Sequence, residues 1–337
     1  MKALESGTDG ARRAAGDIPF AVVGQALIQA VWPVRWIAAF IASIAGIAAI
    51  GCSLADIAIT EVDLISAAAL AVIVVGAIWR AAGLLTAAQP SVFWRWFRGS
   101  SRIGDGLIAI GVWIGSAATA GVLSYLCARL RLPLYDRQFV AVDAALGFNW
   151  LAWSNAVSHY PVLHRTLWMA YNSLKFQLIA TLMLTAFLPG NRRIQFLWAA
   201  TASAMITCVI SGLLPVLGAR PQFGVAGAEW LGDLLLLRGP DQLDFPLTAL
   251  HGIVSLPSYH TVLGVLFAWS VRRTGWLSAA VLALNVVMIV STLNVGGHYL
   301  VDVIAGLLLA WATIATVTAA ERRSHVANLQ YRAAAAS

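Results

Sequence analysis

Charged side chains and cysteines are scarce in this sequence. Only 11% of its 337 residues are Asp, Glu, Lys or Arg, against 60% hydrophobic residues, and the mean hydropathy is +0.79. An average soluble domain has about 25% charged residues, so this composition excludes an ordinary soluble protein. Cys52, Cys127 and Cys208 all lie in or beside apolar segments. Their odd number and their spacing argue against a disulfide framework and a metal site, and we interpret them as small packing residues.

Long apolar segments fill most of the chain. Several have 17 or more nearly uncharged residues, enough to cross a hydrocarbon layer about 30 Å thick. We therefore predict an all-α fold, a polytopic membrane helical bundle with about eight transmembrane helices. The expected spans are 34–52, 62–84, 104–127, 166–188, 194–217, 258–272, 275–295 and 299–320, of which the sixth is short. The weakly apolar stretch 18–31 is expected to form an interfacial helix.

The distribution of basic residues predicts the orientation. With the N-terminus inside, cytoplasmic segments hold 15 of the 22 Lys and Arg residues, outer segments hold 6, and Lys175 falls within a span. This bias predicts a multi-pass protein of the cell (inner) membrane with both termini cytoplasmic. The net charge of +7 is then mostly an inner-face excess. The basic and aromatic cluster at 94–98 is typical of a membrane-interface anchor, so we expect no nucleic-acid partner.

Three regions follow from this pattern. Residues 1–100 are expected to form a cytoplasmic leader and two extra transmembrane helices, 101–320 a six-helix catalytic core, and 321–337 a cytoplasmic tail. Two long outer segments, about 128–165 and 218–257, interrupt the core. Loops of this length are usually functional or disordered. Because the second delivers Pro257-Ser258-Tyr259-His260 to the next helix, we favour a functional role.

Two histidines lie where apolar segments begin. His260 lies in the sequence 256–261, and His298 lies in 291–302, four residues before Asp302. Four residues are about one helical turn, so Asp302 can lie on the His298 face and hold its imidazole ring. The alternation of spans places both histidines, Asp302 and Arg220 at the same outer face.

These residue types can carry out phosphoryl transfer through a histidine nucleophile. His298 attacks as a neutral imidazole whose second nitrogen is held by Asp302. His260 suits the acid that protonates the departing alkoxide. No metal or cofactor is required, because the histidine supplies the nucleophile and Arg220 supplies positive charge.

The phosphate oxygens also need donors and space. Arg220 can bind them with its two-pronged guanidinium group. The Ser258 hydroxyl and the free N–H groups of the first helical turn, including that of Tyr259, can add further hydrogen bonds. Gly297, preceded by Gly296, lets the backbone come close to a ligand at His298.

Each residue also has an ordinary structural interpretation. His298 and Asp302 can form a simple helix hydrogen bond, Ser258 can be a helix cap, and Arg220 can be a loop charge. Lys175 lies about 15 Å into the fourth span, which makes it a functional candidate that can replace a missing cation. Alternatively, it extends to the interface or pairs structurally. The other four histidines we interpret as interfacial polar residues: His159, His164, His251 and His325.

Three short elements resemble the type 2 phosphatidic acid phosphatase superfamily. Pro257-Ser258-Tyr259-His260 resembles its Pro-Ser-x-His element, 291–302 its Ser-x6-His-x3-Asp element, and Arg220-Pro221 the end of its Lys-x6-Arg-Pro element. The resemblance covers about 100–320 and leaves the first two spans outside. It implies that His298 is the nucleophile, Asp302 its partner and His260 the acid, with Arg220 and Ser258 as phosphate ligands.

The sequence departs from the superfamily pattern at three positions. Leu213 stands in place of the lysine, Tyr259 in place of a glycine, and Thr292 in place of an arginine. Together with the segment from Asp143 to Phe148, these changes resemble the inositol phosphorylceramide synthase subgroup. That subgroup contains phosphotransferases that move a phospho-headgroup between lipids or polyols.

The resemblance implies an integral membrane enzyme that acts on phospholipid or polyprenyl-type phosphates at the outer face through a phosphohistidine. The alternative within the same chemistry is headgroup transfer to a polyol or lipid acceptor instead of hydrolysis. An alternative of another class is a transporter or structural membrane protein in which these polar residues line a path. That alternative predicts broken helices near the middle of the bilayer, whereas the residues here gather at one surface.

Overall fold

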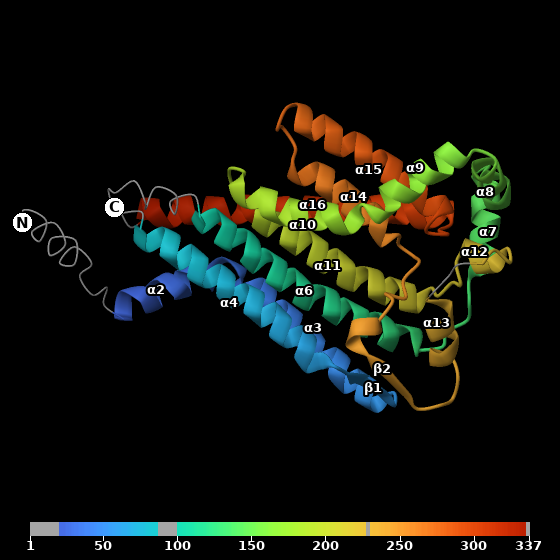
Figure 1. Ribbon diagram of the computed structural model, residues 1–337, viewed down its shortest axis with the longest axis horizontal. Helices are drawn as coiled ribbons and strands as arrows, with labels where there is room; N and C mark the ends of the chain where they lie inside the picture. The colour runs from blue at the N-terminus through green and yellow to red at the C-terminus, as the bar shows by residue number, and fades with distance from the viewer. Residues whose placement is uncertain (1–19, 87–99, 227–229, 335–337) are drawn as a thin grey trace, which may run out of the picture.

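The computed structural model describes residues 20–86, 100–226 and 230–334, and in this part of the chain it is a helical bundle (Figure 1). Six of the expected spans are helices long and apolar enough to cross a membrane. They are α3 (Arg35–Leu54), α4 (Val62–Thr86), α6 (Ser100–Ala128), α11 (Arg192–Leu213), α15 (Trp276–Asn294) and α16 (Leu300–Ala334). The predicted all-α, multi-pass class is thus confirmed. Residues 1–19 and the basic and aromatic cluster at 94–98 lie outside the described residues.

The fourth and sixth expected spans differ from simple transmembrane helices. The fourth is divided at Ser173 into α9 (Pro161–Asn172) and α10 (Leu174–Phe187). The sixth is α14 (Tyr259–Ser270), whose 12 residues extend only about 18 Å, less than the hydrocarbon thickness. Neighbouring helices surround α14, since Val262, Leu266 and Phe267 are fully buried. It is therefore an interior helix of the bundle.

At one end of the bundle, polar contacts connect the starts of some helices with the ends of others. Asp105 of α6 pairs with Arg80 of α4 at 2.6 Å and with Arg193 of α11 at 2.8 Å. Arg192 donates to the Ser270 carbonyl at the end of α14, at 3.0 Å. Gln195 bonds Glu321 near the end of α16. These contacts agree with the expected alternation of the spans, whereas the assignment of this end to the cytoplasm remains a prediction.

The opposite end carries the long connecting segments as short elements (Figure 1). The first segment forms α7 (Asp136–Ala145) and α8 (Trp150–Ser158). The second forms α12 (Ala219–Gln222), α13 (Leu231–Leu237), β2 (Leu243–Pro246) and the 3-10 turn η2 (Leu247–Ala249). Strand β1 (Ile57–Thr60), between α3 and α4, pairs in parallel with β2. The sequence analysis did not predict this small sheet. Before α3, the expected interfacial stretch is the helix α2 (Phe20–Val31), followed by the turn η1 (Trp32–Val34).

The hairpin α3–α4 contacts the rest of the bundle both at its connecting segment and along its helices. Arg129, at the end of α6, donates to the Ala55 carbonyl of the hairpin and to the carbonyls of Gly239 and Asp241. Within the bundle, α4 and α6 approach at backbone distance: a Cβ added to Gly104 would lie 2.5 Å from the Gly76 carbonyl oxygen. Small residues permit such close helix packing in membranes. The hairpin is therefore an integral part of the bundle.

Candidate active site

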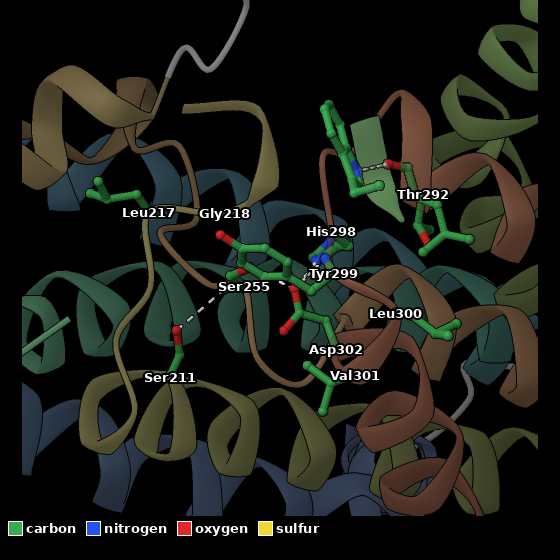
Figure 2. Close-up of polar contacts among 12 residues, drawn as sticks. Ser211, Leu217, Gly218, Ser255, Thr292, His298, Tyr299, Leu300, Val301 and Asp302 are labelled. Atoms are coloured by element: carbon green, nitrogen blue, oxygen red, sulfur yellow. Dashed lines mark hydrogen bonds and ion pairs between the residues drawn. The ribbon is translucent and has the colours of Figure 1, made fainter. Parts of the chain in front are cut away.

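His298 and Asp302 form a buried pair at the start of α16 (Figure 2). The Nδ1 atom of His298 lies 3.2 Å from Oδ2 of Asp302, and the two residues are 7% and 0% exposed. The same oxygen accepts hydrogen bonds from the Ser255 hydroxyl at 2.9 Å and from the Tyr299 backbone N–H at 3.0 Å. A carboxylate accepts but does not donate, so Nδ1 carries the proton and Nε2 has a free lone pair. This is the tautomer that a histidine nucleophile needs.

The start of α14 is attached to the same turn of α16. The Ser258 backbone N–H donates to the Asp302 carbonyl at 2.9 Å. His260 follows in the first turn of α14 and stacks on Tyr171 of α9, with ring centroids 4.2 Å apart and planes 11° from parallel. A Cβ added to Gly296 would lie 3.0 Å from Tyr171 and 3.1 Å from His298. Gly296 therefore lies close to both rings, so the Tyr171 ring that stacks on His260 also lies near His298.

Arg220 reaches the site through α12. Its side chain lies over Gly297, where an added Cβ would be 2.6 Å from Cγ and 2.9 Å from Cδ of Arg220. Gly297 has φ +67°, and its carbonyl accepts the Ala219 N–H at 2.8 Å. Any side chain at 297 would displace the arginine and strain the backbone. The glycine therefore brings the guanidinium-bearing side chain next to His298.

The other expected site residues are Ser258, Tyr259 and Lys175, and their surroundings differ. Ser258 is fully buried, and within the described residues its hydroxyl has no hydrogen-bond partner. The Tyr259 hydroxyl donates to the Ala200 carbonyl of α11 at 2.8 Å. Because its side chain is used in this way, Tyr259 can reach a phosphate only through its backbone N–H. Lys175 is exposed in the first turn of α10 and does not join the buried group at His298.

Two aspartates of α7 position the site, and the sequence analysis gave neither of them a role. Asp136 accepts the backbone N–H groups of Leu217 and Gly218 and the Tyr299 hydroxyl at 2.9 to 3.1 Å. It thereby connects the segment before Arg220 with the residue after His298. Burial raises the pKa of the Tyr299 hydroxyl, so it remains a donor to Asp136.

Asp143 caps the helix that carries the catalytic pair. Its two carboxylate oxygens accept the N–H groups of Leu300 and Val301 at 2.9 and 3.0 Å. A negative charge at a helix N-terminus is favourable, and these two bonds satisfy N–H groups that have no partner within α16. Asp136 and Asp143 are seven residues apart, two helical turns, and so lie on one face of α7. The seven-residue spacing of these two aspartates was the signal in the sequence, although it does not identify the groups that they bind.

A third support comes from α8. Trp150 is buried, donates from Nε1 to the Leu293 carbonyl near the end of α15 at 2.6 Å, and stacks on Phe223 with centroids 5.5 Å apart. These contacts hold the turn before His298 against the segment that follows Arg220. The helix α8 in the first outer segment thus helps to shape the site.

The remaining histidines lie apart from this buried group. His159 and His164 are exposed. His251 pairs with Asp233 at 3.3 Å, but its side chain is 46% exposed. The side chain of His325 lies outside the described residues. Within the described parts of the chain, no group of three or more His, Cys, Asp or Glu side chains is arranged to hold a metal ion.

Comparison with known protein families adds an independent finding. The family model of the PAP2 superfamily matches residues 137–316, which is 180 of 337 residues and includes all the site residues above except Asp136. The match begins after α6 and leaves the hairpin α3–α4 outside. Comparisons with curated proteins and with solved structures return no match. On the family match, which extends over more than half of its length, the chain belongs to the PAP2 superfamily, as its motifs suggested.

Proposed function

We propose that this protein is a membrane phosphoesterase or phosphotransferase that acts on phospholipid or polyprenyl-type phosphates through a phosphohistidine at His298. Membership of the PAP2 superfamily supports phosphatase or phosphotransferase chemistry in general. The observation that carries the proposal is the buried contact of His298 Nδ1 with Asp302, whose carbonyl accepts the Ser258 N–H at the start of the helix that bears His260. We further propose that this end of the bundle faces the outside of the cell membrane.

In the proposed mechanism each residue has one step. Nε2 of His298 attacks phosphorus, and the bond from phosphorus to the leaving oxygen breaks. Arg220 and the N–H groups at the start of α14 bind the phosphoryl oxygens, because this transfer depends chiefly on positioning and electrostatics. Burial lowers the pKa of His260, so this ring must first take up a proton from water before it gives one to the departing alkoxide. Water or an acceptor hydroxyl then attacks phosphorus, and the bond to Nε2 breaks.

The depth of the site fits a lipid substrate. Asp302 and Glu321 are 19 residues apart on α16, which corresponds to about 28 Å along the helix. Glu321 belongs to the polar network at the other end of the bundle. The hydrocarbon layer of a bilayer is about 30 Å thick, so His298 and Asp302 lie near one of its boundaries. A phosphate headgroup lies at this level while its chains remain in the apolar layer.

Headgroup transfer is the second candidate, and two observations favour it. Leu213 is 54% exposed, and Thr292 is buried with its hydroxyl bonded to the Ile289 carbonyl, so neither position provides a cation. A site with fewer cations suits a phosphodiester, which has one negative charge, better than a monoester. In addition, a cavity of about 380 Å³ lies beside Tyr299, lined in part by Asp143 and Trp150. We propose that a polyol or lipid acceptor binds there, as expected for an enzyme like inositol phosphorylceramide synthase.

Purified protein incubated with phosphate-labelled phospholipid, with and without inositol or other polyols, tests these proposals. We expect an acid-labile phosphorylated histidine that maps to His298 and is absent in His298→Asn. His251→Asn is the matched control, because it removes a histidine that also pairs with an aspartate. Release of free phosphate alone would exclude transfer as the main activity. If His298→Ala retained normal phosphoester turnover, the enzyme proposal would be wrong and a transport or structural role would be favoured.

A further inference from the structure

Two apolar cavities lie side by side between the hairpin α3–α4 and the rest of the bundle. One has a volume of about 640 Å³ and is bounded by α3, α4, α6 and β1. The other has a volume of about 490 Å³ and is bounded by α6, α11 and the 247–254 segment. Both are lined by Ile65, Ala118 and Leu247, so they adjoin each other at these side chains. We call the combined space the hairpin groove.

The hairpin groove is separate from the phosphate site, and one segment of chain divides the two. Val254 and Tyr259 line the groove. Ser255 and Ser258, in the same segment, bond Asp302 on the other side. The groove also opens to the protein surface, since Val62 on its wall is 44% exposed. That surface belongs to helices apolar enough to cross a membrane, so lipid has access to it.

We propose that the hairpin groove binds one ester-linked hydrocarbon chain of a membrane lipid. Its lining is mainly aliphatic, which suits a hydrocarbon chain and not a polar ligand. A methylene group occupies about the volume of one water molecule, roughly 30 Å³, so the two cavities have room for an ordinary acyl chain that extends from the smaller one into the larger one. The proposal does not depend on the enzymatic activity of the protein.

The polar atoms on the wall identify the ester. In the smaller cavity, the Tyr259 hydroxyl bonds Ala200, the Cys208 thiol bonds the Ala120 carbonyl, the Ser124 hydroxyl bonds the Gly121 carbonyl and the Thr248 hydroxyl bonds Glu61, so these groups need no ligand. Thr207 also lines the groove and is 1% exposed, yet its hydroxyl has no hydrogen-bond partner within the described residues. A buried unpaired hydroxyl is costly. An ester carbonyl in the groove would accept its hydrogen bond.

Gly115 allows the groove to be filled without disturbing the backbone. It lines the groove, and a Cβ added to it meets no atom within 4 Å. Gly115→Phe therefore places a ring in the space assigned to the chain. Gly46→Phe is the matched control, because Gly46 lies on α3, is exposed, is absent from the groove lining and also has no atom within 4 Å of an added Cβ. Thermal unfolding in detergent checks that both variants fold.

The test uses the full chain in phosphatidylcholine vesicles that contain a phosphatidylcholine with a photoreactive diazirine at the end of one acyl chain. We expect cross-links concentrated in peptides of α4, α6 and α11 that line the groove. Gly115→Phe should reduce them several-fold, whereas Gly46→Phe should not. Thr207→Val should reduce occupancy about fivefold, the effect of losing one hydrogen bond. His298→Asn should leave the cross-links unchanged, which separates this inference from the proposed function.

Three results would overturn the proposal. Cross-links spread evenly over all lipid-facing helices would show that the groove holds no preferred chain. Equal labelling of wild type and Gly115→Phe would show the same. A dimer in the vesicles, detected with a bifunctional protein cross-linker and abolished by Gly115→Phe, would assign the groove to a second copy of the chain instead of a lipid.

Discussion

Replacing Asp302 with Asn tests the central geometric argument with a minimal change of shape. Oδ2 of Asp302 accepts from His298 Nδ1, the Ser255 hydroxyl and the Tyr299 N–H. The carboxamide of Asn has one oxygen and a donating NH2 group in place of two accepting oxygens. The three donors share Oδ2, so the single Asn oxygen can replace it only with loss of the negative charge that fixes the imidazole tautomer. If the NH2 group takes that place instead, all three donors lose their acceptor. A proton on Nε2 would then block attack on phosphorus.

The expected loss can be given a magnitude. In a histidine held by a carboxylate, the corresponding change of tautomer lowers kcat by about 10⁴. This corresponds to about 5.5 kcal/mol in the activation free energy. Stability should change less, because the variant loses charge-assisted hydrogen bonds but no longer buries a charge. We therefore expect Asp302→Asn to fold and bind substrate while forming phosphohistidine very slowly.

Rapid-quench measurement of phosphohistidine formation, with thermal unfolding in parallel, checks this expectation. Asp233→Asn is the matched control, since Asp233 contacts both His251 and Tyr125 and lies in a second His-Asp pair. It should leave the rate of phosphohistidine formation near that of wild type. The reasoning is refuted if Asp302→Asn forms phosphohistidine within tenfold of the wild-type rate, because the tautomer would then not depend on the carboxylate.

Three further substitutions test other parts of the site and of the bundle. Arg220→Lys keeps the charge but loses the two-pronged donor, so kcat/KM for a labelled phospholipid should fall about 10²-fold. An unchanged kcat/KM would show that Arg220 does not bind the phosphate. Asp136→Asn should lower the free energy of unfolding by about 2 kcal/mol, because the hydrogen bonds lose their charge and an NH2 group replaces the oxygen that faces the Leu217 N–H. Unchanged denaturation curves would contradict this role. Gly104→Ala should lower the thermal unfolding temperature in detergent, because its Cβ meets backbone at 2.5 Å, whereas the control Gly115→Ala should maintain or raise it. Equal shifts in both variants would contradict close packing of α4 on α6.

Hydropathy and motif spacing were sufficient for much of this architecture. Six expected spans are long apolar helices, and the four-residue spacing of His298 and Asp302 does bring their side chains together. Both results depend on local periodicity, which a single sequence displays directly. The family was also identifiable, because its motifs are short contiguous elements.

The contacts that complete the site could not be predicted from hydropathy or motif spacing. Strand β1 pairs with a segment 186 positions away, from Ile57 to Leu243, and Tyr299 bonds Asp136 over 163 positions. Backbone N–H groups are the main partners of Asp136, and they leave no trace in residue identity. Similarly, hydropathy predicted one continuous span at 166–188, whereas the structure has a break at Ser173, close to Tyr171. Tertiary packing decides such features, and hydropathy averages over them.

The arrangement around Asp302 also explains how a fully buried carboxylate is tolerated. An isolated buried charge is very costly, and hydrogen bonds from several donors offset that cost. Here two donors besides His298 converge on Oδ2, from Ser255 and from the backbone of Tyr299, while Oδ1 has no hydrogen-bond partner within the described residues. The protein itself therefore fixes the carboxylate orientation before the imidazole is considered. It follows that a phosphorylated His298 need not remain bonded to Asp302 for the acceptor to be in place when the ring returns to the neutral form.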